Sequence, residues 1–409
     1  MNNADYWARR MRILGDAIRD QSYDYALNLE KQFDEAIREI DKTMRAWYQR
    51  FAKNNGISFG EANRLLTAGE LKEFKWDVWK YIEKCKENAV KGNWIKELEN
   101  ASARVHISRL DALKYQLRQQ AEMLTASRVQ ATTDASELAY TQSYYHTAFE
   151  VQKAIGVGWT MQGVNNTLLE KILSRPWTVD NQTFTARCWT DKVKLVETVN
   201  QELTRMVATG APPDRAIANI AKQFNTTKSN AGRVVMTESS YFSSAARQDC
   251  FNELEVERYV VVGTLEKSTC EFCGEMDGKV FKMSEYKPGA TANPFHPWCR
   301  CDTAPYYEDM AHLGTRHARD VVTGKGYRVP KDMTYQQWKE AQDELHGAGS
   351  VDKARKMHRN ETSDRQQFAT YKSRLGKNAP RSFAEFQKLK YDNPEGYAAL
   401  KKLYKSKGG

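Results

Sequence analysis

The chain has 409 residues, which is more than one hydrophobic core usually serves, so two or three domains are expected. A hydrophobic fraction of 41%, a charged fraction of 28% and a mean hydropathy of −0.73 predict a soluble protein with solvated helices. The first residues do not resemble a signal peptide, and no apolar run approaches the roughly 20 residues of a membrane span. These features disfavour a secreted or membrane-spanning protein, and we expect synthesis in a reducing cytoplasm.

The net charge of +10 is concentrated in the last quarter of the chain. Residues 311–409 contain 21 Lys and Arg against 11 Asp and Glu, whereas the first 310 residues contain 41 of each sign. A basic segment of this kind suits a phosphate backbone or another acidic surface. A solvated helical face would have the same composition, so both interpretations stay open.

Residues 1–150 are predicted to form long amphipathic helices. Proline is absent before Pro176, so nothing forbids helix in this region. Breaks are expected at 54–56 and near 92–93, giving a bundle or helical arms whose apolar stripe forms an intrachain core rather than an oligomer seam. Apolar residues recur every three or four positions at Trp7, Met11, Leu14 and Ile18, and again at Leu29, Phe33, Ile37, Ile40, Met44, Trp47 and Phe51.

The middle of the chain, residues 151–310, has a mixed pattern. A loop is expected around Arg175-Pro176-Trp177, followed by helices over 192–208, 213–224 and 229–250. A strand is predicted at 258–263, and a Gly-containing turn near Gly278 leads to a second extended pair, Val280-Phe281. This region therefore predicts a helical part followed by a compact α+β module.

After Tyr307 the chain is expected to be helical and basic. Short helices are predicted at 334–346, 352–375, 382–390 and 395–405, with loops at 324–326 and 347–349. Ser382 and Glu385 have the spacing of a capping box. The predicted fold class is α+β and predominantly α-helical. We expect three parts: a helical arm or bundle at 1–150, a middle domain at 151–310, and a basic helical region at 311–409.

The strongest chemical signal is a group of five metal-capable side chains within thirty-two residues. Two pairs have two intervening residues each, a spacing that lets both side chains of a pair converge on one tetrahedral zinc ion. Twenty-two residues between the pairs are enough for a short hairpin. The chain has seven cysteines, and the three outside the group are scattered singly. The candidate ligands are Cys270, Cys273, His296, Cys299 and Cys301.

A closed zinc site needs four ligands, so the sequence leaves the choice among the five open. Cys270, Cys273 and Cys299 are favoured, with His296 or Cys301 as the fourth. A disulfide or a reactive cysteine is the alternative, although a reducing compartment disfavours it. The neighbouring sequence lacks the H-x-E, H-E-x-x-H and second-histidine patterns of zinc enzymes. The group therefore predicts a structural zinc site, and no catalytic residues are assigned.

A second polar group lies on the predicted helix 229–250. Arg233 and Thr237 are four residues apart on one helical face, and Glu238 follows directly. The simplest interpretation is an exposed or half-buried salt bridge. Trp177 and Trp189, which flank Arg187 and Cys188, are interpreted as core anchors.

These residues, in this order, resemble the phage minor head protein family, whose Mu F-like domain occurs beside portal genes in tailed bacteriophages. The resemblance covers roughly residues 150–305. One departure is Phe295, where relatives often have a second proline. The matching residues are Trp177, Arg187 and Trp189, then Arg233, Thr237 and Glu238, then Cys270, Cys273, Asp277, Gly278, Lys279, Phe281, Pro294, His296, Cys299, Arg300 and Cys301.

The resemblance implies a non-enzymatic, structural role in the virion. Family members join the procapsid in few copies, bind the portal protein and affect DNA packaging or delivery, and some leave with the genome. It implies location in the phage head near the portal, with the portal, and scaffold or major capsid protein, as partners. The basic C-terminal region would then contact DNA. The alternatives are a Mu F-like protein with a C-terminal ADP-ribosyltransferase or nuclease, and a DNA-binding zinc module of the host.

Overall fold

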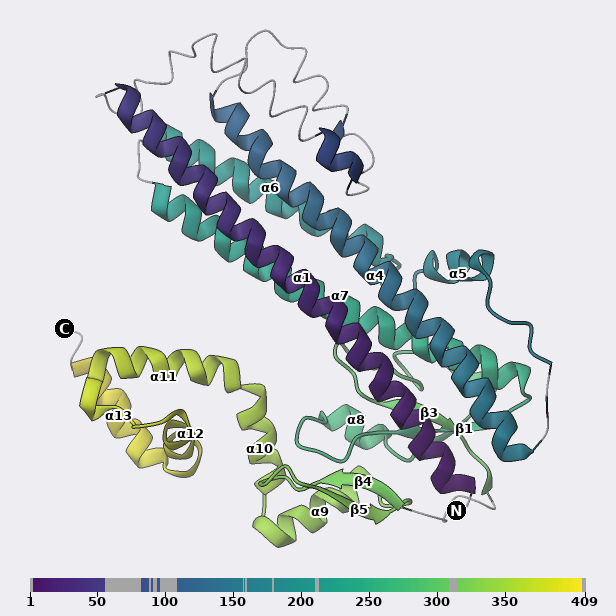
Figure 1. The fold of residues 1–409 in the computed structure, drawn as a ribbon. Helices are drawn as coiled ribbons and strands as arrows, with labels where there is room; N and C mark the ends of the chain where they lie inside the picture. Colours follow the sequence, from purple (N-terminus) through teal and green to yellow (C-terminus); the bar gives the residue numbers. More distant parts are fainter. Residues whose placement is uncertain are drawn as a thin grey trace. The chain divides into compact units, whose positions relative to one another are not determined.

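The computed structural model describes residues 3–55, 82–87, 90, 94–95, 109–156, 158, 160–178, 180–209, 213–308 and 315–406. The chain forms two compact units. One consists of Met1–Arg12, Glu255–Tyr286 and Arg300–Gly409, and the other of Ile13–Leu254 and Lys287–Cys299. The first unit holds the strands and the second is helical, which confirms a predominantly helical α+β protein (Figure 1). The functional division at 150 and 310 stays a prediction.

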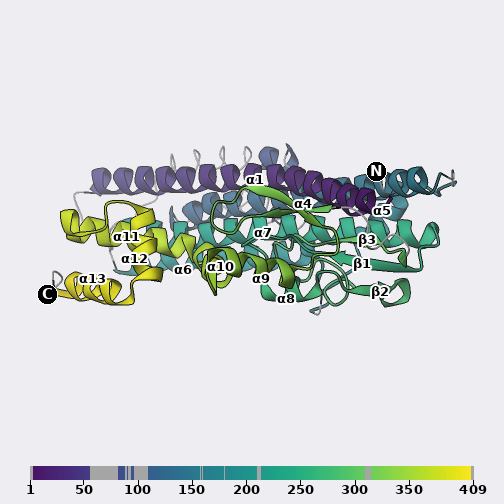
Figure 2. The same cartoon turned by 90° about the horizontal axis from the view of Figure 1, so that it is seen from below.

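Long helices form the second unit. They are α1 (Asn3–Asn55, from Ile13 onward), α4 (Arg109–Ile155), α6 (Phe184–Thr209) and α7 (Pro213–Glu253). The short α5 (Asn166–Leu173) lies between α4 and α6 in the chain. Figures 1 and 2 show the four long helices running alongside one another. Their shared core includes Leu29, Phe33, Ile40 and Met44 of α1, Leu117 and Leu124 of α4, Leu195 and Leu203 of α6, and Phe224 and Val235 of α7.

The apolar stripe of α1 is therefore an intrachain core, as predicted. The side chains of Trp7, Trp47 and Phe51 lie outside the described residues, as do the expected breaks at Gly56 and 92–93. None of the helices in the described ranges has the length and apolar character needed to cross a bilayer.

The two helices predicted at 213–224 and 229–250 are one continuous helix, α7. The polar segment between them suggested a break, but its hydroxyl groups bond within the helix. Thr226 donates to the Lys222 carbonyl and Ser229 to the Asn225 carbonyl, both at 3.1 Å. This back-bonding satisfies side chains that elsewhere would cap a helix end. The helix predicted at 192–208 begins earlier, at Phe184.

The first unit contains a three-stranded antiparallel sheet of order β2-β1-β3. The strands are β1 (Arg258–Val262), β2 (Val280–Lys282) and β3 (Asp302–Pro305), with the short helix α8 (Glu271–Met276) between β1 and β2 and a 3-10 turn, η2 (Met283–Glu285), after β2. Tyr259 of β1 pairs with Phe281 on one side and Pro305 on the other, and it is fully buried. The predicted strand and the Val280-Phe281 pair are confirmed.

A second, two-stranded sheet was not predicted. It is a hairpin of β4 (Thr315–Arg319) and β5 (Gly326–Pro330), in a region where only loop and helix were expected. Both strands are short and polar, with one buried residue each, Ala318 and Val329. Their alternation is too weak to indicate a strand without the partner.

Helices α9 (Tyr335–His346), α10 (Ser350–Arg359), α11 (Glu361–Leu375), α12 (Phe383–Asp392) and α13 (Pro394–Ser406) follow, with a 3-10 turn, η4 (Gly376–Asn378), after α11. The single helix predicted at 352–375 is two helices that meet at Asn360, whose side chain donates to the Tyr391 hydroxyl at 3.1 Å. Ser382 caps α12 as predicted, accepting from the Glu385 amide. A full capping box lies at Thr334 and Gln337.

Candidate metal cluster and pocket

The first cysteine pair is held by the start of α8. Cys270 is the N-cap residue, and its Sγ accepts a hydrogen bond from the Cys273 amide at 3.4 Å. Cys273 is buried on the first turn. A helix N-terminus favours negative charge, so this turn suits thiolate ligands. The two-residue spacing of Cys270 and Cys273 therefore has the predicted tight geometry.

The structure brings all five predicted residues into two overlapping triplets. The donor atoms of Cys270, Cys273 and His296 lie within 4.8 Å of one another, and so do those of Cys273, Cys299 and Cys301. All four cysteines are free thiols. Zinc–sulfur bonds of about 2.3 Å in a tetrahedron place sulfur atoms about 3.8 Å apart, so donors this close need only small movements to bind one ion. The donor set fits zinc.

His296 has a ring orientation that suits a ligand. Its Nδ1 lies 2.7 Å from the carbonyl oxygen of Pro297, and the Cys299 amide donates to the His296 carbonyl at 3.1 Å. A carbonyl can only accept, so the ring proton is on Nδ1 and the lone pair is on Nε2. Metal-binding histidines commonly use their second nitrogen in this way. Metal binding by these residues stays a prediction.

Asp277, one residue after α8, is the centre of a buried polar network. Its side chain is fully buried and accepts from the Gly263 amide at 2.7 Å and the Tyr335 amide at 2.8 Å. Arg316 donates to both carboxylate oxygens at 2.9 Å. The same guanidinium donates to the Gly263 and Met333 carbonyls. Asp277 thus joins the segment that carries the cysteines to the β4–β5 hairpin and α9.

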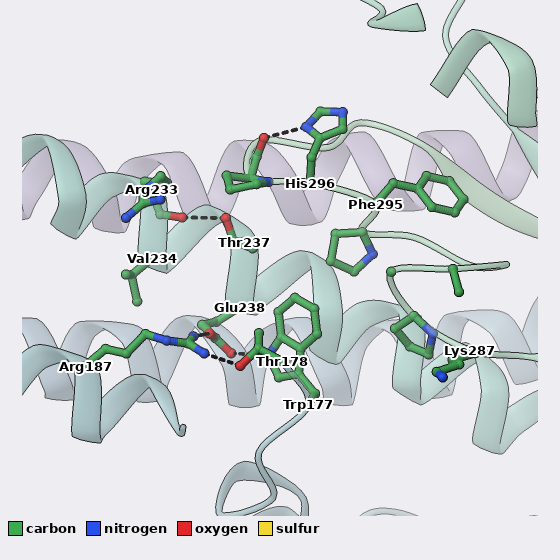
Figure 3. A pocket seen from close by; sticks show the side chains of 15 residues that line it. Trp177, Thr178, Arg187, Arg233, Val234, Thr237, Glu238, Lys287, Phe295 and His296 are labelled. Carbon is green, nitrogen blue, oxygen red and sulfur yellow. Dashed lines mark hydrogen bonds and ion pairs between the residues drawn. The ribbon is translucent and has the colours of Figure 1, made fainter. Parts of the chain in front are cut away.

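The helical unit contains a pocket of about 740 Å³ at α7. Figure 3 shows α7 side chains on one side and the loop of residues 287–297 on the other. Side chains from three separated parts of the sequence pattern described above line this pocket: the segment from Trp177 to Arg187, the helix with Arg233 and Glu238, and the loop with Pro294 and His296. The lining includes Trp177, Arg187, Arg233, Thr237, Glu238, Pro294 and His296.

Glu238 lies beneath this pocket and is 2% exposed. Its Oε2 accepts from the Trp177 indole at 2.8 Å, and its Oε1 accepts from Arg187 at 3.3 Å. Burial raises the pKa of Glu238 to about 7, and the Trp177 hydrogen bond and the Arg187 charge oppose that rise. Arg187 is also paired with Asp180 at 2.7 Å and bonded to Thr178.

The expected salt bridge therefore exists, but its cation comes from α6. Among the described residues, the Arg233 side chain has one hydrogen bond, a 3.4 Å contact with the Asn230 side chain. Trp177 is partly exposed and stacks on Tyr241, with ring centroids 4.4 Å apart. Trp189 is also only partly buried, with the Lys192 ammonium 4.7 Å from its ring centroid. Neither tryptophan is a fully buried core anchor.

Sequence reasoning missed several partners, among them Arg316, Tyr335, Thr178, Asp180 and Lys287. Each acts across a long gap in sequence or from a loop. The capping box at Thr334 was a usable signal for the start of α9 at Tyr335. No short motif marks Arg316 or Lys287.

The described chain is thus a mostly helical protein with a Cys/His cluster that could hold a metal ion. Residues 197–304 match the family described as Phage Mu protein F like protein, from within α6 to β3. This match confirms the resemblance to phage minor head proteins over these residues and supports a phage head-related protein. Comparisons with curated proteins and with solved structures found no match.

Proposed function

We propose that the protein is a minor component of a bacteriophage head, bound near the portal and acting in head assembly and in DNA packaging or delivery. The observation that carries this proposal is the family match over residues 197–304, which contains all five Cys/His residues. The long helices of the second unit supply the surface for the portal or for scaffold and capsid protein. The protein is made in the host cytoplasm and stays in the virion or leaves with the genome.

The metal's role in this proposal is structural. Zinc bound by Cys273 and three of the other four donors would tie α8 to the segment before β3. A three-stranded sheet with strands of three to five residues has little core of its own, so a metal adds stability that packing does not supply. No general base is assigned, and the proposal has no catalytic step.

Mass spectrometry of purified virions, and of ghosts after DNA release, tests this proposal. The protein should be present in virions at a few copies for each portal ring, and its loss from ghosts would indicate ejection. Pull-down with purified portal rings tests the partner, with tail-tube protein as the control bait. Absence from virions, or transferase or nuclease turnover by the pure protein, would overturn the proposal.

Contact with DNA is assigned to the basic helices at the C-terminus. Deleting residues 311–409 is a poor test because it removes Arg316 and Tyr335 from the buried Asp277 network. A charge variant of α13 avoids this problem. Lys401, Lys402 and Lys405 are exposed. Their change to Gln removes the contact of the Lys401 ammonium with the Tyr397 ring, at 4.8 Å from the ring centroid, and keeps the buried side chains of α13 unchanged.

If these three lysines contact phosphates, the slope of log K against log salt should fall by about 2 to 3 in the triple variant. A matched control changes three exposed lysines of the helical unit to Gln. These are Lys31, Lys42 and Lys222. Equal slopes for the two triple variants would contradict the assignment of DNA contact to α13.

A further inference from the structure

The pocket at α7 has two exposed cations beside a buried carboxylate that is already hydrogen-bonded. Both oxygens of Glu238 already accept hydrogen bonds, and Arg187 is neutralised by Glu238 and Asp180. Arg233 and Lys287 also line the pocket, are exposed, and have no ion-pair partner among the described residues. A negatively charged occupant would therefore complement this pocket.

The wall formed by the loop is apolar and has few backbone donors to offer. Pro288, Pro294 and Pro297 have no N–H group, and the amides of Gly289 and Ala290 bond to Ala292 and Lys287 within the loop. An incoming strand would therefore find few N–H donors along this wall. Recognition must come from apolar contact and from the charged side chains at the rim.

The two free cations are separated by this apolar wall. Figure 3 shows Arg233 and Lys287 at opposite ends of the pocket, with Trp177 between them. One face of the Trp177 ring is covered by Tyr241, and its N–H is used by Glu238. A nucleic-acid strand would need cations that follow its phosphates and open ring faces for its bases. The arrangement suits an apolar side chain with a carboxylate on each side of it.

We propose that this pocket binds a peptide segment of a partner protein in which acidic residues flank an apolar or proline residue. The volume of about 740 Å³ is within the range of specific ligand sites. The inference goes beyond the head-protein role and does not depend on it, since it rests on the lining of the pocket. The acidic residues would lie against Arg233 and Lys287, and the apolar residue against Trp177 and the prolines.

The test uses the full chain and an array of synthetic hexapeptides with Asp or Glu at each end. The central positions vary over Leu, Val, Phe, Trp and Pro, and a second array has Lys at the ends. Affinity for the best peptide is then measured by fluorescence anisotropy. Arg233→Gln and Lys287→Gln should each weaken binding at least about threefold, the size of a partly exposed charge pair. Arg215→Gln and Lys222→Gln, exposed residues of α7, are the matched controls.

A variant that blocks the pocket shows whether the peptide enters the pocket or only contacts the charged residues at its rim. Ala290 is an exposed lining residue, so Ala290→Trp should fill the pocket and weaken binding more than about tenfold without lowering the melting temperature. Equal binding of the two arrays, no binding to either, or affinities that the pocket variants leave unchanged would overturn the proposal. So would an oligothymidine strand that displaces the peptide and binds more tightly in an Arg233-dependent way.

Discussion

Changing Asp277 to Asn tests whether the buried Asp277 carboxylate anchors the β4–β5 hairpin and α9, which follow the family match in the chain. Asn is uncharged, and its side-chain NH2 group replaces one of the two carboxylate oxygens. That NH2 group would then face a hydrogen-bond donor that the oxygen accepts from in the native protein. Four hydrogen bonds of 2.7–2.9 Å end on the Asp277 carboxylate, and its side chain is fully buried. Removing one partner of a buried, hydrogen-bonded ion pair costs about 3–5 kcal/mol, because the remaining charge is left unpaired.

Hydrogen exchange followed by mass spectrometry is the suitable assay, because a chain with two units does not unfold in one two-state step. If the loss is local, peptides from β4, β5 and the start of α9 should exchange about a hundred- to several-thousandfold faster, as expected for about 3–5 kcal/mol. Peptides from α1 and α4 should not change. Glu361→Gln is the matched control, since Glu361 pairs with Arg365 in an exposed bridge worth under about 1 kcal/mol.

Arg316→Met completes a double-mutant cycle with Asp277→Asn. Each single variant leaves an unpaired group, whereas the double variant removes both charges. The double variant should therefore be less damaged than the sum of the two single variants. Exchange within about threefold of the wild type in Asp277→Asn, or losses that simply add, would refute the view that this pair anchors the hairpin and α9.

Cys273 belongs to both triplets, so Cys273→Ser should abolish stoichiometric zinc, measured by plasma mass spectrometry. Cys299→Ser and Cys301→Ser should each abolish zinc only if the changed residue is a ligand. Glu238 has a raised pKa of about 7, so its contribution to stability is full below about pH 4.5 and is lost as pH rises through 7. Glu238→Gln should remove about 3 kcal/mol of that pH dependence, measured as exchange of α7 at pH 5 and 8, and an unchanged profile would contradict it. Gly274→Ala would place a Cβ 2.3 Å from the Tyr335 ring and should cost about 1–3 kcal/mol in the stability of α9, with no cost meaning that the ring moves freely.

Helix periodicity and cysteine spacing were enough to predict the broad fold. The stripe through Leu29, Phe33 and Met44 is a core because a three-four repeat puts one face of α1 toward its neighbours. The continuity of α7 was not predictable in the same way. Whether Thr226 and Ser229 cap a new helix or bond back to the preceding turn depends on packing, and a local sequence does not contain that information.

The site was predicted only as far as its residues lie close in sequence. The spacing of Cys270 and Cys273 determines their geometry, because one turn of chain joins them. Glu238 was assigned to a salt bridge, but the nearest cation in sequence, Arg233, is not its partner. Helix α7 places Glu238 within hydrogen-bonding distance of Arg187 on α6 and of Trp177 in the loop before α6, and it leaves Arg233 exposed. Residues about one helical turn apart on α7 therefore differ in role: Glu238 forms an ion pair with Arg187 beneath the pocket, and Arg233 is an exposed cation at its rim. The exposed Arg233 is what makes the pocket suited to an acidic partner.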